Sequence, residues 1–336
     1  MLRILQFAIV LVFLSCSKKV ESTTTIPPVV QPPVTPKPTL ITLPVGWKLS
    51  TVYGTNFPTG IQVYQFDTIH AGKQVKAVCV AYDSKITTID FKPVMSATAI
   101  TPTAFAAAET GTVYACMNGG YFGSNQSFSL VKYNNIVSSA NIKALTRAFN
   151  GNNVSYFPTR AAFGVTSTGA PSIAWIYNVG TGNNLIYSYP SPSPNMLNVA
   201  PQPQPTETFP ANGSVWNTVS AIGGSPMLIK NNNIQITDAE ELISINNTTS
   251  RPRSAIGYNS NGIIMLVAVE GDNAPTYTGI NLADLATLLK NLGCVEAINL
   301  DGGGSTSLVI NGVKTVRPGD NGVERPVVSA IIIKQK

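Results

Sequence analysis

Apolar and polar residues alternate with a period of two over much of the chain, which predicts β-strands rather than helices. Several of these runs are separated by short turns rich in Asn and Gly, a spacing typical of β-hairpins. The hairpins expected from this pattern lie at residues 61–83, 128–139, 226–237 and 254–271. We therefore expect an α+β fold of mixed, strand-rich sheets with hairpins, one clear β-α-β unit and few helices.

One segment, NLADLATLLKNLG at residues 281–293, departs from this period and has the pattern of an amphipathic helix. Asn281 is a suitable N-cap, Asp284 stands at the capping-box position, and Gly293 is a suitable stop. The leucines of the segment fall on one helical face. A shorter helix is expected near residues 102–109.

The long helix lies between two apolar runs, 263–269 and 295–300, and so completes a β-α-β unit. Such units are almost always parallel and right-handed, so both strands end at the same edge of the sheet. Glu270 follows the first strand and Asp301 follows the second. Ligands tend to bind beyond the carboxyl ends of such strands, although acidic residues also cap ordinary turns. The placement makes this edge a candidate site without deciding its function.

Apolar strands also run directly into consecutive glycines at three places. These junctions are Asn118-Gly119-Gly120, Gly223-Gly224 and Gly302-Gly303-Gly304, the last preceded by Asn299 and Asp301 and followed by Ser305. Glycine lets a ligand approach the backbone closely, so several such junctions favour one small-molecule pocket. Arg253 and Arg325 stand next to further strands and offer planar pairs of donors to phosphate or carboxylate. The spacing of a Rossmann or P-loop motif is absent from the sequence.

The first residues, MLRILQFAIVLVFLSC, have a basic residue, an apolar run and a cysteine, as in a bacterial lipoprotein signal. We expect residues 1–16 to be this signal, Cys16 to be lipidated, and residues 17–42 to form a Pro/Thr-rich tether. The catalytic domain is expected at 43–336, with a proline-rich loop at 190–210. The expected location is the bacterial cell envelope, lipid-anchored to an outer membrane or facing the periplasm. An ordinary signal peptide with a chance cysteine is the alternative.

Charged residues are only 11% of the chain, and its net charge of +6 comes from scattered lysines and arginines. No basic run interleaves with aromatic residues, so no nucleic-acid partner is expected. Cys79, Cys116 and Cys294 stand in apolar stretches of the sequence. We expect them to be buried as small hydrophobic residues, or one pair of them to form a disulfide. The single histidine, His70, excludes a His-rich zinc site and disfavours a Ser-His-Asp triad. The chemistry is therefore expected from carboxylates, from arginine, lysine, tyrosine or asparagine side chains, or from backbone amides.

The sequence blocks MNGGYF, AIGGSPMLI, RPRSAIGYNSNGIIMLVAVEG, INLDGGGSTSLVINGV and ERPVVSAIII occur in this order between about Tyr114 and Ile333. Their order and spacing resemble the phosphodiester glycosidase family. The resemblance implies hydrolysis of a sugar, GlcNAc-like, from a sugar-1-phosphodiester in envelope or host-derived glycans. One departure is Asp272, which follows Glu270-Gly271 where relatives often carry a basic residue.

Carried over position by position, the resemblance implies Asp301 and Glu270 as catalytic carboxylates. The substrate-binding residues that it implies are Asn118, Gly119, Gly120, Gly223, Gly224, Arg253, Asn299, Gly302, Gly303, Gly304, Ser305 and Arg325. A phosphate ester is a good leaving group, so this chemistry needs less general-acid help than ordinary glycoside hydrolysis does. Which carboxylate is nucleophile, acid or base stays open.

No cofactor is implied, and no residues have a spacing that requires a metal, although a divalent ion near the acidic loops stays open. The expected partners are a phosphorylated glycan or sugar-phosphodiester substrate and, through the lipid anchor, a membrane. The alternative function is a non-catalytic, glycan-binding surface lipoprotein of the same fold.

Overall fold

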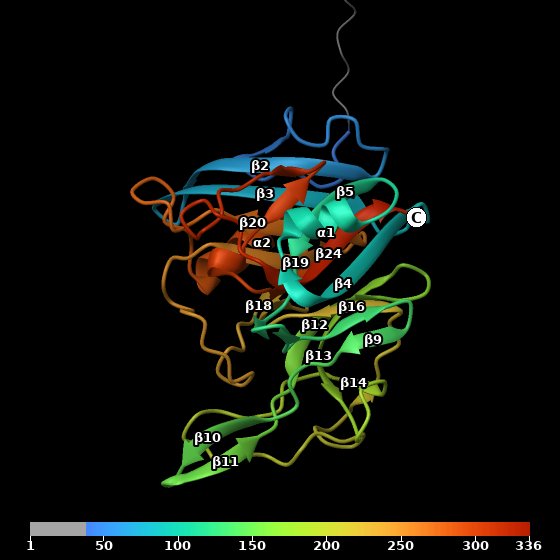
Figure 1. Ribbon diagram of the computed structural model, residues 1–336. Coiled ribbons are helices and arrows are strands. Elements are labelled where there is room, and N and C mark those ends of the chain that lie inside the picture. The colour runs from blue at the N-terminus through green and yellow to red at the C-terminus, as the bar shows by residue number, and fades with distance from the viewer. Residues whose placement is uncertain (1–37) are drawn as a thin grey trace, which may run out of the picture. The chain divides into compact units, whose positions relative to one another are not determined.

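Three twisted β-sheets form most of the computed structural model, which describes residues 38–336 (Figure 1). Within this part of the chain, Thr39–Lys336 make one compact unit. Its helical elements are α1 (Pro102–Ala108), α2 (Leu282–Asn291) and the 3₁₀ turn η1 (Gly303–Ser305). The predicted strand-rich α+β class and both predicted helices are confirmed. The predicted signal, the lipidation site Cys16 and the tether as far as residue 37 lie outside the described residues.

The largest sheet has eight strands and carries the predicted β-α-β unit. In spatial order they are β1 (Trp47–Leu49), β2 (Ile61–His70), β3 (Lys73–Asp83), β20 (Ile263–Val269), β19 (Arg253–Asn259), β21 (Cys294–Asn299), β17 (Met227–Lys230) and β18 (Asn233–Ile234). The hairpins β2–β3, β17–β18 and β19–β20 confirm three of the hairpins expected from the sequence.

A seven-stranded sheet lies below the first in Figure 1. Its strands, in spatial order, are β15 (Ser214–Val215), β14 (Ile186–Tyr189), β13 (Pro171–Asn178), β12 (Arg160–Val165), β16 (Ser220–Gly223), β8 (Val131–Tyr133) and β9 (Ile136–Ser139). The predicted β8–β9 hairpin is confirmed, and its turn residues Asn134 and Asn135 both have positive φ. The proline-rich segment 190–210 runs between β14 and β15, two paired strands of this sheet.

The third sheet has five strands and contains the last strand of the chain. Its spatial order is β23 (Val313–Lys314), β22 (Leu308–Ile310), β5 (Val113–Asn118), β24 (Val327–Gln335) and β4 (Ile89–Ile100). The remaining strands form two two-stranded ribbons. In one, β6 (Phe122–Gly123) pairs with β7 (Gln126–Ser127), and in the other, β10 (Leu145–Phe149) pairs with β11 (Asn152–Tyr156). The β10–β11 ribbon projects beyond the seven-stranded sheet (Figure 1).

The two strands of the β-α-β unit are parallel, but they are not direct neighbours. Both β20 and β21 pair antiparallel with β19, which lies between them, so β20 and β21 point the same way. In this register Arg253, the first residue of β19, pairs with Val269, the last residue of β20. The edge predicted for Glu270 and Asp301 is therefore confirmed, and the start of β19 brings Arg253 to it.

Strand β20 explains why the sequence shows an unbroken apolar run at 263–269: both of its faces are buried. Ile264, Leu266 and Ala268 pack into the core shared with the other sheets. Ile263, Met265, Val267 and Val269 face a second core under α2, with the helix leucines at 282, 285, 288 and 289. Each such leucine, when buried, stabilises the fold by roughly 1.5–3 kcal/mol. The sheet is thus fixed from both sides at the predicted site.

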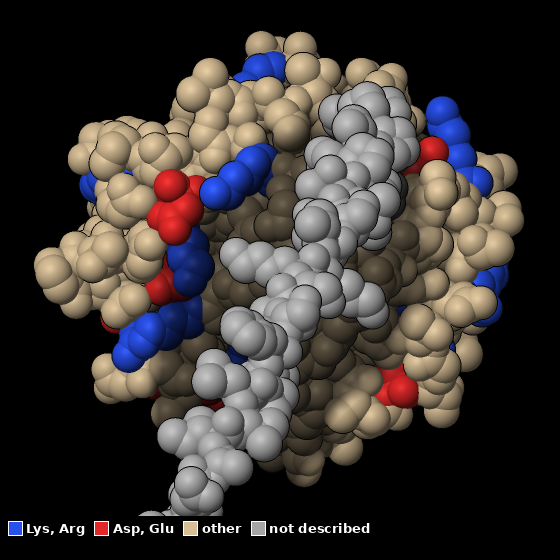
Figure 2. Space-filling view, turned by 90° about the horizontal axis from the view of Figure 1, so that it is seen from above, with Lys and Arg blue, Asp and Glu red and all other residues tan. Residues whose placement is uncertain are grey.

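The three described cysteines are buried, and the charged residues are mixed in sign on the face that Figure 2 shows. Cys79, Cys116 and Cys294 are buried and free, so the disulfide that the sequence left open does not form among them. Burial raises the pKa of the Cys294 thiol to about 12. On the face shown in Figure 2, lysines and arginines are interspersed with acidic residues and form no continuous basic surface. None of the helices in residues 38–336 is long and apolar enough to cross a membrane.

Candidate active site

A polar pocket of about 160 Å³ lies at the edge where β20, β19 and β21 meet. Its walls come from the 3₁₀ turn after β21, the start of β19, the segment before β19 and Arg325, two residues before β24. The lining residues are Ile245, Asn246, Arg251, Arg253, Asp301, Gly302, Gly303, Gly304 and Arg325. The structure therefore brings together the predicted residues Asp301, Arg253, Arg325 and the three consecutive glycines.

Asp301 is the one carboxylate in this lining. Its backbone oxygen accepts a 2.7 Å hydrogen bond from Asn118 Nδ2, and its Oδ1 accepts a 2.9 Å hydrogen bond from the Gly302 N–H. Burial raises the pKa of Asp301 to about 6, although Ser305, the Gly302 N–H and the charge of Arg325 each lower it. The buried Ser305 hydroxyl has no partner at conventional hydrogen-bond distance. Asp301 thus changes charge just below neutral pH.

Arg253 is a buried cation, 2% exposed, with no ion pair among the described residues. Its guanidinium donates hydrogen bonds to four backbone carbonyls, those of Ile245, Asn246, Thr249 and Ile280. Because a guanidinium has five N–H groups, at most one is left for a ligand. Burial lowers the pKa of Arg253 to about 10, which still leaves it charged at neutral pH. Its main contribution is an uncompensated positive charge in the pocket wall.

Arg251 and Arg325 also line the pocket, and each has an aspartate partner. Arg251 Nη2 lies 3.5 Å from Asp272 Oδ2. Arg325 makes two parallel bonds to Asp320, 2.7 Å from Nε and 2.8 Å from Nη2. Bidentate pairs of this kind fix the plane of the guanidinium and leave its other edge free for an anion. Asp272, the departure from the family pattern, therefore balances an arginine beside the site.

The glycines of the 302–304 turn allow these arginines to lie against the backbone. A Cβ on Gly304 would come within 2.2 Å of both Arg325 Nη2 and Asp320 Oδ1. Gly303 has φ +58°, which few residues with a side chain adopt, and its Cβ position lies 3.5 Å from Arg251 Nη2. The groups that approach this backbone in the structure are arginine and aspartate side chains, and the predicted approach of a ligand stays a prediction.

Glu270 lies at the same sheet edge but is not among the residues that line the pocket. Its Oε2 contacts Lys76 Nζ at 2.8 Å and accepts a 2.9 Å bond from the Arg317 N–H, and its Oε1 accepts a bond from Asn273. Burial opposes ionisation, but these three donors outweigh it and lower the pKa of Glu270. Both oxygens of this carboxylate are thus occupied by the protein, and its predicted catalytic role stays a prediction.

Asn118 has no free group for a substrate. Its Nδ2 donates to the backbone oxygen of Asp301, and its Oδ1 accepts bonds from Ser254 Oγ at 2.7 Å and the Ser307 N–H at 3.2 Å. Asn299 also lies outside the pocket lining, and its Nδ2 donates to Tyr121 OH, 2.7 Å away. Substrate contact by either residue stays a prediction.

The other two glycine junctions serve close packing between sheets. The lining of the pocket contains none of Gly119, Gly120, Gly223, Gly224 or Ser305. A Cβ on Gly120 would lie 2.3 Å from the Gly223 oxygen, and one on Gly224 would lie 2.3 Å from the Asn299 oxygen. These glycines therefore let β5, β16 and β21 approach, and their predicted contacts with substrate are not tested by this arrangement.

Some residues around the site were not predicted from the sequence. Ile245 and Asn246 line the pocket from an irregular segment without a motif. Tyr121, the residue after Gly120, is held by Asn299, and burial and the charge of Asp301 raise its pKa. Asp320 has a recognisable signal, since it sits in a Pro-Gly-Asp-Asn-Gly turn five residues before Arg325.

Comparisons with known proteins show the family and the fold of this chain. Residues 111–334 match the sequence model of a family described as phosphodiester glycosidase. A bovine protein named N-acetylglucosamine-1-phosphodiester alpha-N-acetylglucosaminidase is 34% identical over 113 residues, 31% of this chain and 21% of its own length. An uncharacterised prophage-derived protein of Bacillus subtilis is 37% identical over 82 residues, 24% of this chain and 12% of its own length. The chain therefore spans about a fifth or less of the length of these relatives.

Two solved structures share the fold. A hypothetical protein from Synechocystis superposes with a TM-score of 0.56 at 20% identity, covering 88% of this chain and 69% of its own. The catalytic domain of a zebrafish N-acetylglucosamine-1-phosphodiester alpha-N-acetylglucosaminidase, described as auto-inhibited by its pro-peptide, has a TM-score of 0.54 at 17% identity. It covers 87% of this chain and 89% of its own length. At these identities the likeness concerns the fold alone.

Proposed function

We propose, from the premise that this chain belongs to the phosphodiester glycosidase family, that it hydrolyses a sugar-1-phosphodiester at the Asp301 pocket. The products are the free sugar and a phosphate monoester. The sugar is GlcNAc-like, as in the substrates named for its mammalian relatives. The natural substrate is an envelope or host-derived glycan.

The observation that carries this proposal is the set of three arginines around one carboxylate in a single small pocket. The charges of Arg251 and Arg325 are balanced by Asp272 and Asp320, whereas Arg253 has no carboxylate partner. A phosphodiester carries one negative charge, and guanidinium groups recognise its oxygens with paired donors. A bound phosphodiester would supply the counter-charge that Arg253 lacks.

Asp301 is then the group that acts on the anomeric carbon. With its pKa near 6, it is mostly ionised at pH 7 and can attack that carbon or activate a water molecule. The sugar–oxygen bond breaks, and the phosphate leaves with the electron pair. Water supplies the new anomeric hydroxyl: it attacks the sugar directly and gives its proton to Asp301, or it hydrolyses the sugar–Asp301 ester that direct attack forms. Arg253, Arg251 and Arg325 stabilise the charge that develops on the departing phosphate. Because phosphate monoesters are weak bases, the step needs no strong acid.

Glu270 enters this proposal as a positioning residue. Its bonds to Lys76, Asn273 and the Arg317 N–H join three segments beside the pocket and hold the chain that leads to Asp320 and Arg325. No second carboxylate is needed at the leaving-group side when the leaving group is a phosphate ester.

The test is release of free sugar from a synthetic GlcNAc-1-phosphodiester by the wild-type protein and by Asp301→Asn. We expect turnover by the wild type and a loss of at least about 1,000-fold in the variant, with an unchanged fold by circular dichroism. Binding of the substrate without release of sugar by the wild type would instead identify a non-catalytic glycan-binding protein. Activity within a few-fold of wild type in Asp301→Asn would exclude Asp301 as the catalytic carboxylate.

We further propose that Cys16 is lipidated and anchors the protein in the bacterial envelope. The support is the basic, apolar and Ser-Cys pattern of residues 1–16. Metabolic labelling with a radioactive fatty acid should mark the wild type and leave Cys16→Ser unlabelled. Labelling of Cys16→Ser, or fractionation of the wild type away from membranes, would contradict the anchor.

The proposed reaction uses no cofactor. Residues 38–336 contain no cluster of three or more His, Cys, Asp or Glu side chains that could hold a metal ion. Assaying sugar release after dialysis against EDTA tests this proposal directly: activity should persist, and a loss restored by a divalent cation would refute it.

A further inference from the structure

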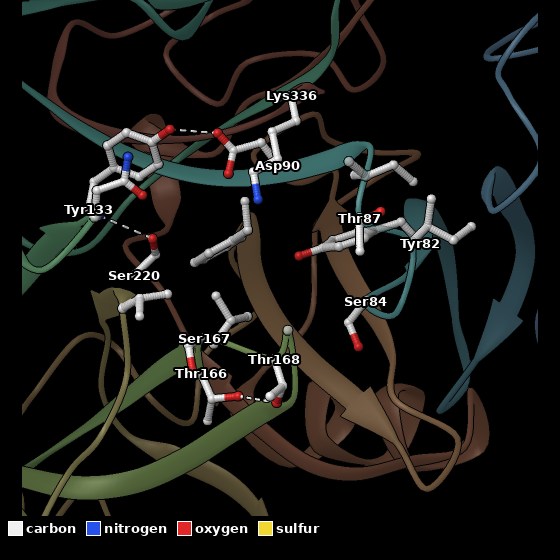
Figure 3. A pocket seen from close by; sticks show the side chains of 17 residues that line it. Tyr82, Ser84, Thr87, Asp90, Tyr133, Thr166, Ser167, Thr168, Ser220 and Lys336 are labelled. Atoms are coloured by element: carbon white, nitrogen blue, oxygen red, sulfur yellow. Dashed lines mark hydrogen bonds between the residues drawn. The ribbon is translucent and has the colours of Figure 1, made fainter.

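A second pocket, of about 240 Å³, lies where the three sheets meet and shares no lining residue with the Asp301 pocket (Figure 3). One wall is the end of β3, the turn that follows it and the start of β4. The opposite wall comes from the β8–β9 turn, the end of β12 with its turn, and β16. The pocket therefore depends on tertiary assembly and has no sequence motif.

The two walls of this pocket meet where the turn after β3 contacts the turn after β12. Gly169, with φ +81°, lies so near the turn after β3 that a Cβ would come within 2.4 Å of the Ser84 oxygen. A hydrogen bond of 2.9 Å joins the Thr166 and Thr168 hydroxyls within the same turn (Figure 3). The shape of the pocket is thus built into the fold.

Tyr82 contributes a buried hydroxyl without a partner. The side chain is 2% exposed, and its hydroxyl accepts or donates no hydrogen bond within the described residues. Figure 3 shows the Tyr82 ring at the edge of the pocket with its hydroxyl directed inward. An unsatisfied buried hydroxyl costs roughly 1–3 kcal/mol, so an occupant of the pocket that bonds to it would gain stability.

Asp90 gives the pocket a carboxylate with one oxygen to spare. Its Oδ2 accepts a 2.6 Å hydrogen bond from the Tyr133 hydroxyl, drawn in Figure 3. Its Oδ1 accepts no hydrogen bond from the described residues, and the side chain forms no ion pair with them. Ser84, Thr87 and Ser167 add hydroxyls, and Lys336 extends its side chain toward the same space.

The lining also has apolar side chains, among them the ring of Phe91, which packs edge-on against Phe163. An aromatic surface next to a carboxylate and several hydroxyls suits a ligand with one C–H face and many hydroxyl groups. The side chains of Asp90 and Lys336 give the lining one charge of each sign, which favours a neutral ligand, and one carboxylate is too few for a metal ion. The volume is below the roughly 300–1,000 Å³ of ligand pockets in general, which limits the ligand to about one ring.

We propose that this pocket binds a single neutral sugar residue and is a glycan-binding site separate from the proposed active site. Asp90 accepts hydrogen bonds from the sugar hydroxyls, and Tyr82 forms with the sugar the bond that it lacks in the protein. A glycan carrying several sugars could then be held at a distance from the bond that is cleaved.

The experiment titrates methyl glycosides of common hexoses and N-acetylhexosamines into the full chain, followed by ligand-observed NMR and calorimetry. These glycosides lack phosphate, so binding is measured independently of hydrolysis. Tyr82→Phe and Asp90→Asn are the test variants, and Asp301→Asn monitors the other pocket. Tyr156→Phe is the matched control, since it loses a hydroxyl bonded to the Val199 oxygen and lies in neither pocket.

We expect at least one glycoside to bind with a Kd in the millimolar range or tighter. Tyr82→Phe should weaken it by about 3-fold or more and Asp90→Asn by about 10-fold, while Tyr156→Phe binds as wild type. Weakening in Asp301→Asn alone would place the glycoside in the other pocket and would overturn the proposal. The Tm of Tyr82→Phe should be at least that of wild type, because its hydroxyl has no partner to lose. No binding by any glycoside at 20 mM, or undiminished binding by both test variants, would leave a water-filled pocket and overturn the proposal. Neither result bears on hydrolysis at Asp301, so the two proposals fail separately.

Discussion

The side-chain amide of Asn118 donates a hydrogen bond of 2.7 Å to the backbone carbonyl of Asp301. Asn118 ends β5 of the five-stranded sheet, whereas Asp301 follows β21 of the eight-stranded sheet. The bond therefore joins two sheets at the point where the proposed catalytic carboxylate leaves its strand. Asp301 is held by a second bond between the same segments, since its N–H donates a 3.2 Å hydrogen bond to the Gly119 oxygen.

Replacing Asn118 by Ala should impair both stability and catalysis. The change leaves the Asp301 oxygen, the Ser254 hydroxyl and the Ser307 N–H without their partner, at about 1–3 kcal/mol for each group that water cannot reach. We expect a Tm lower by several degrees and a fall in kcat larger than the change in KM. The matched control is Asn233→Ala, an exposed residue of β18 whose side chain donates to the Asn231 oxygen. An unchanged Tm in Asn118→Ala would refute the anchoring role.

The pH dependence of the rate should report the ionisation of Asp301. Because only the ionised carboxylate can attack or act as a base, kcat/KM should rise with pH through an apparent pKa near 6. The charge of Arg325 lowers the pKa of Asp301, so Arg325→Gln should move this rise to higher pH. Absence of any ionisation between pH 5 and 7 in the wild-type profile would contradict the assignment.

The same carboxylate should affect stability with the opposite sign from a salt-bridged aspartate. The pKa of Asp301 is about 6 in the fold against an ordinary value of 3.8, so ionisation disfavours the folded state. The stability that the protonated Asp301 side chain contributes to the fold is fully present below pH 3.8, and it is lost as the pH rises through 6. Asp301→Asn should therefore be at least as stable as wild type at pH 7.5, with the difference shrinking by pH 4. Chemical denaturation at both pH values measures this, and a variant much less stable at pH 7.5 would disprove it.

Arg253 and Arg325 should respond differently to replacement by lysine. Arg253 donates to four backbone carbonyls, three in the segment 245–249 and that of Ile280, and a single ammonium cannot reproduce this arrangement. Arg253→Lys should lower the Tm and raise KM for the phosphodiester. Arg325 is about 43% exposed, so Arg325→Lys should raise KM with little change in Tm. Equal effects on the Tm of the two variants would argue against a stabilising role for the hydrogen bonds between Arg253 and the four carbonyls.

Glu270→Gln distinguishes positioning from catalysis. The neutral amide weakens the contact with Lys76 and cannot accept as strongly from the Arg317 N–H. We expect a lower Tm and a loss of activity of about 10-fold, with the pH profile of Asp301 retained. A loss as large as that of Asp301→Asn, with an unchanged Tm, would instead make Glu270 a second catalytic carboxylate.

Local patterns in the sequence were sufficient for the elements and for part of the site. The hairpin turns at Asn134-Asn135 and Asn261-Gly262, and the helix that begins after Asn281, follow from residues adjacent in the chain. The β-α-β topology placed Glu270 and Asp301 at one edge because a crossover connection fixes the direction of both strands.

The roles of the individual side chains depended on packing between distant segments, which no local pattern records. Gly120 and Gly224 are needed because strands from different sheets nearly touch, and Glu270 is occupied because Lys76 and Arg317 reach it from elsewhere in the chain. The second pocket, lined by Tyr82 and Asp90, likewise exists only where the three sheets converge. The sequence by itself determined the strands, the turns and the chemistry available at one sheet edge. The tertiary structure decided which of those polar groups remain free for a ligand, because a buried polar group bonds to whatever partner the fold places within reach.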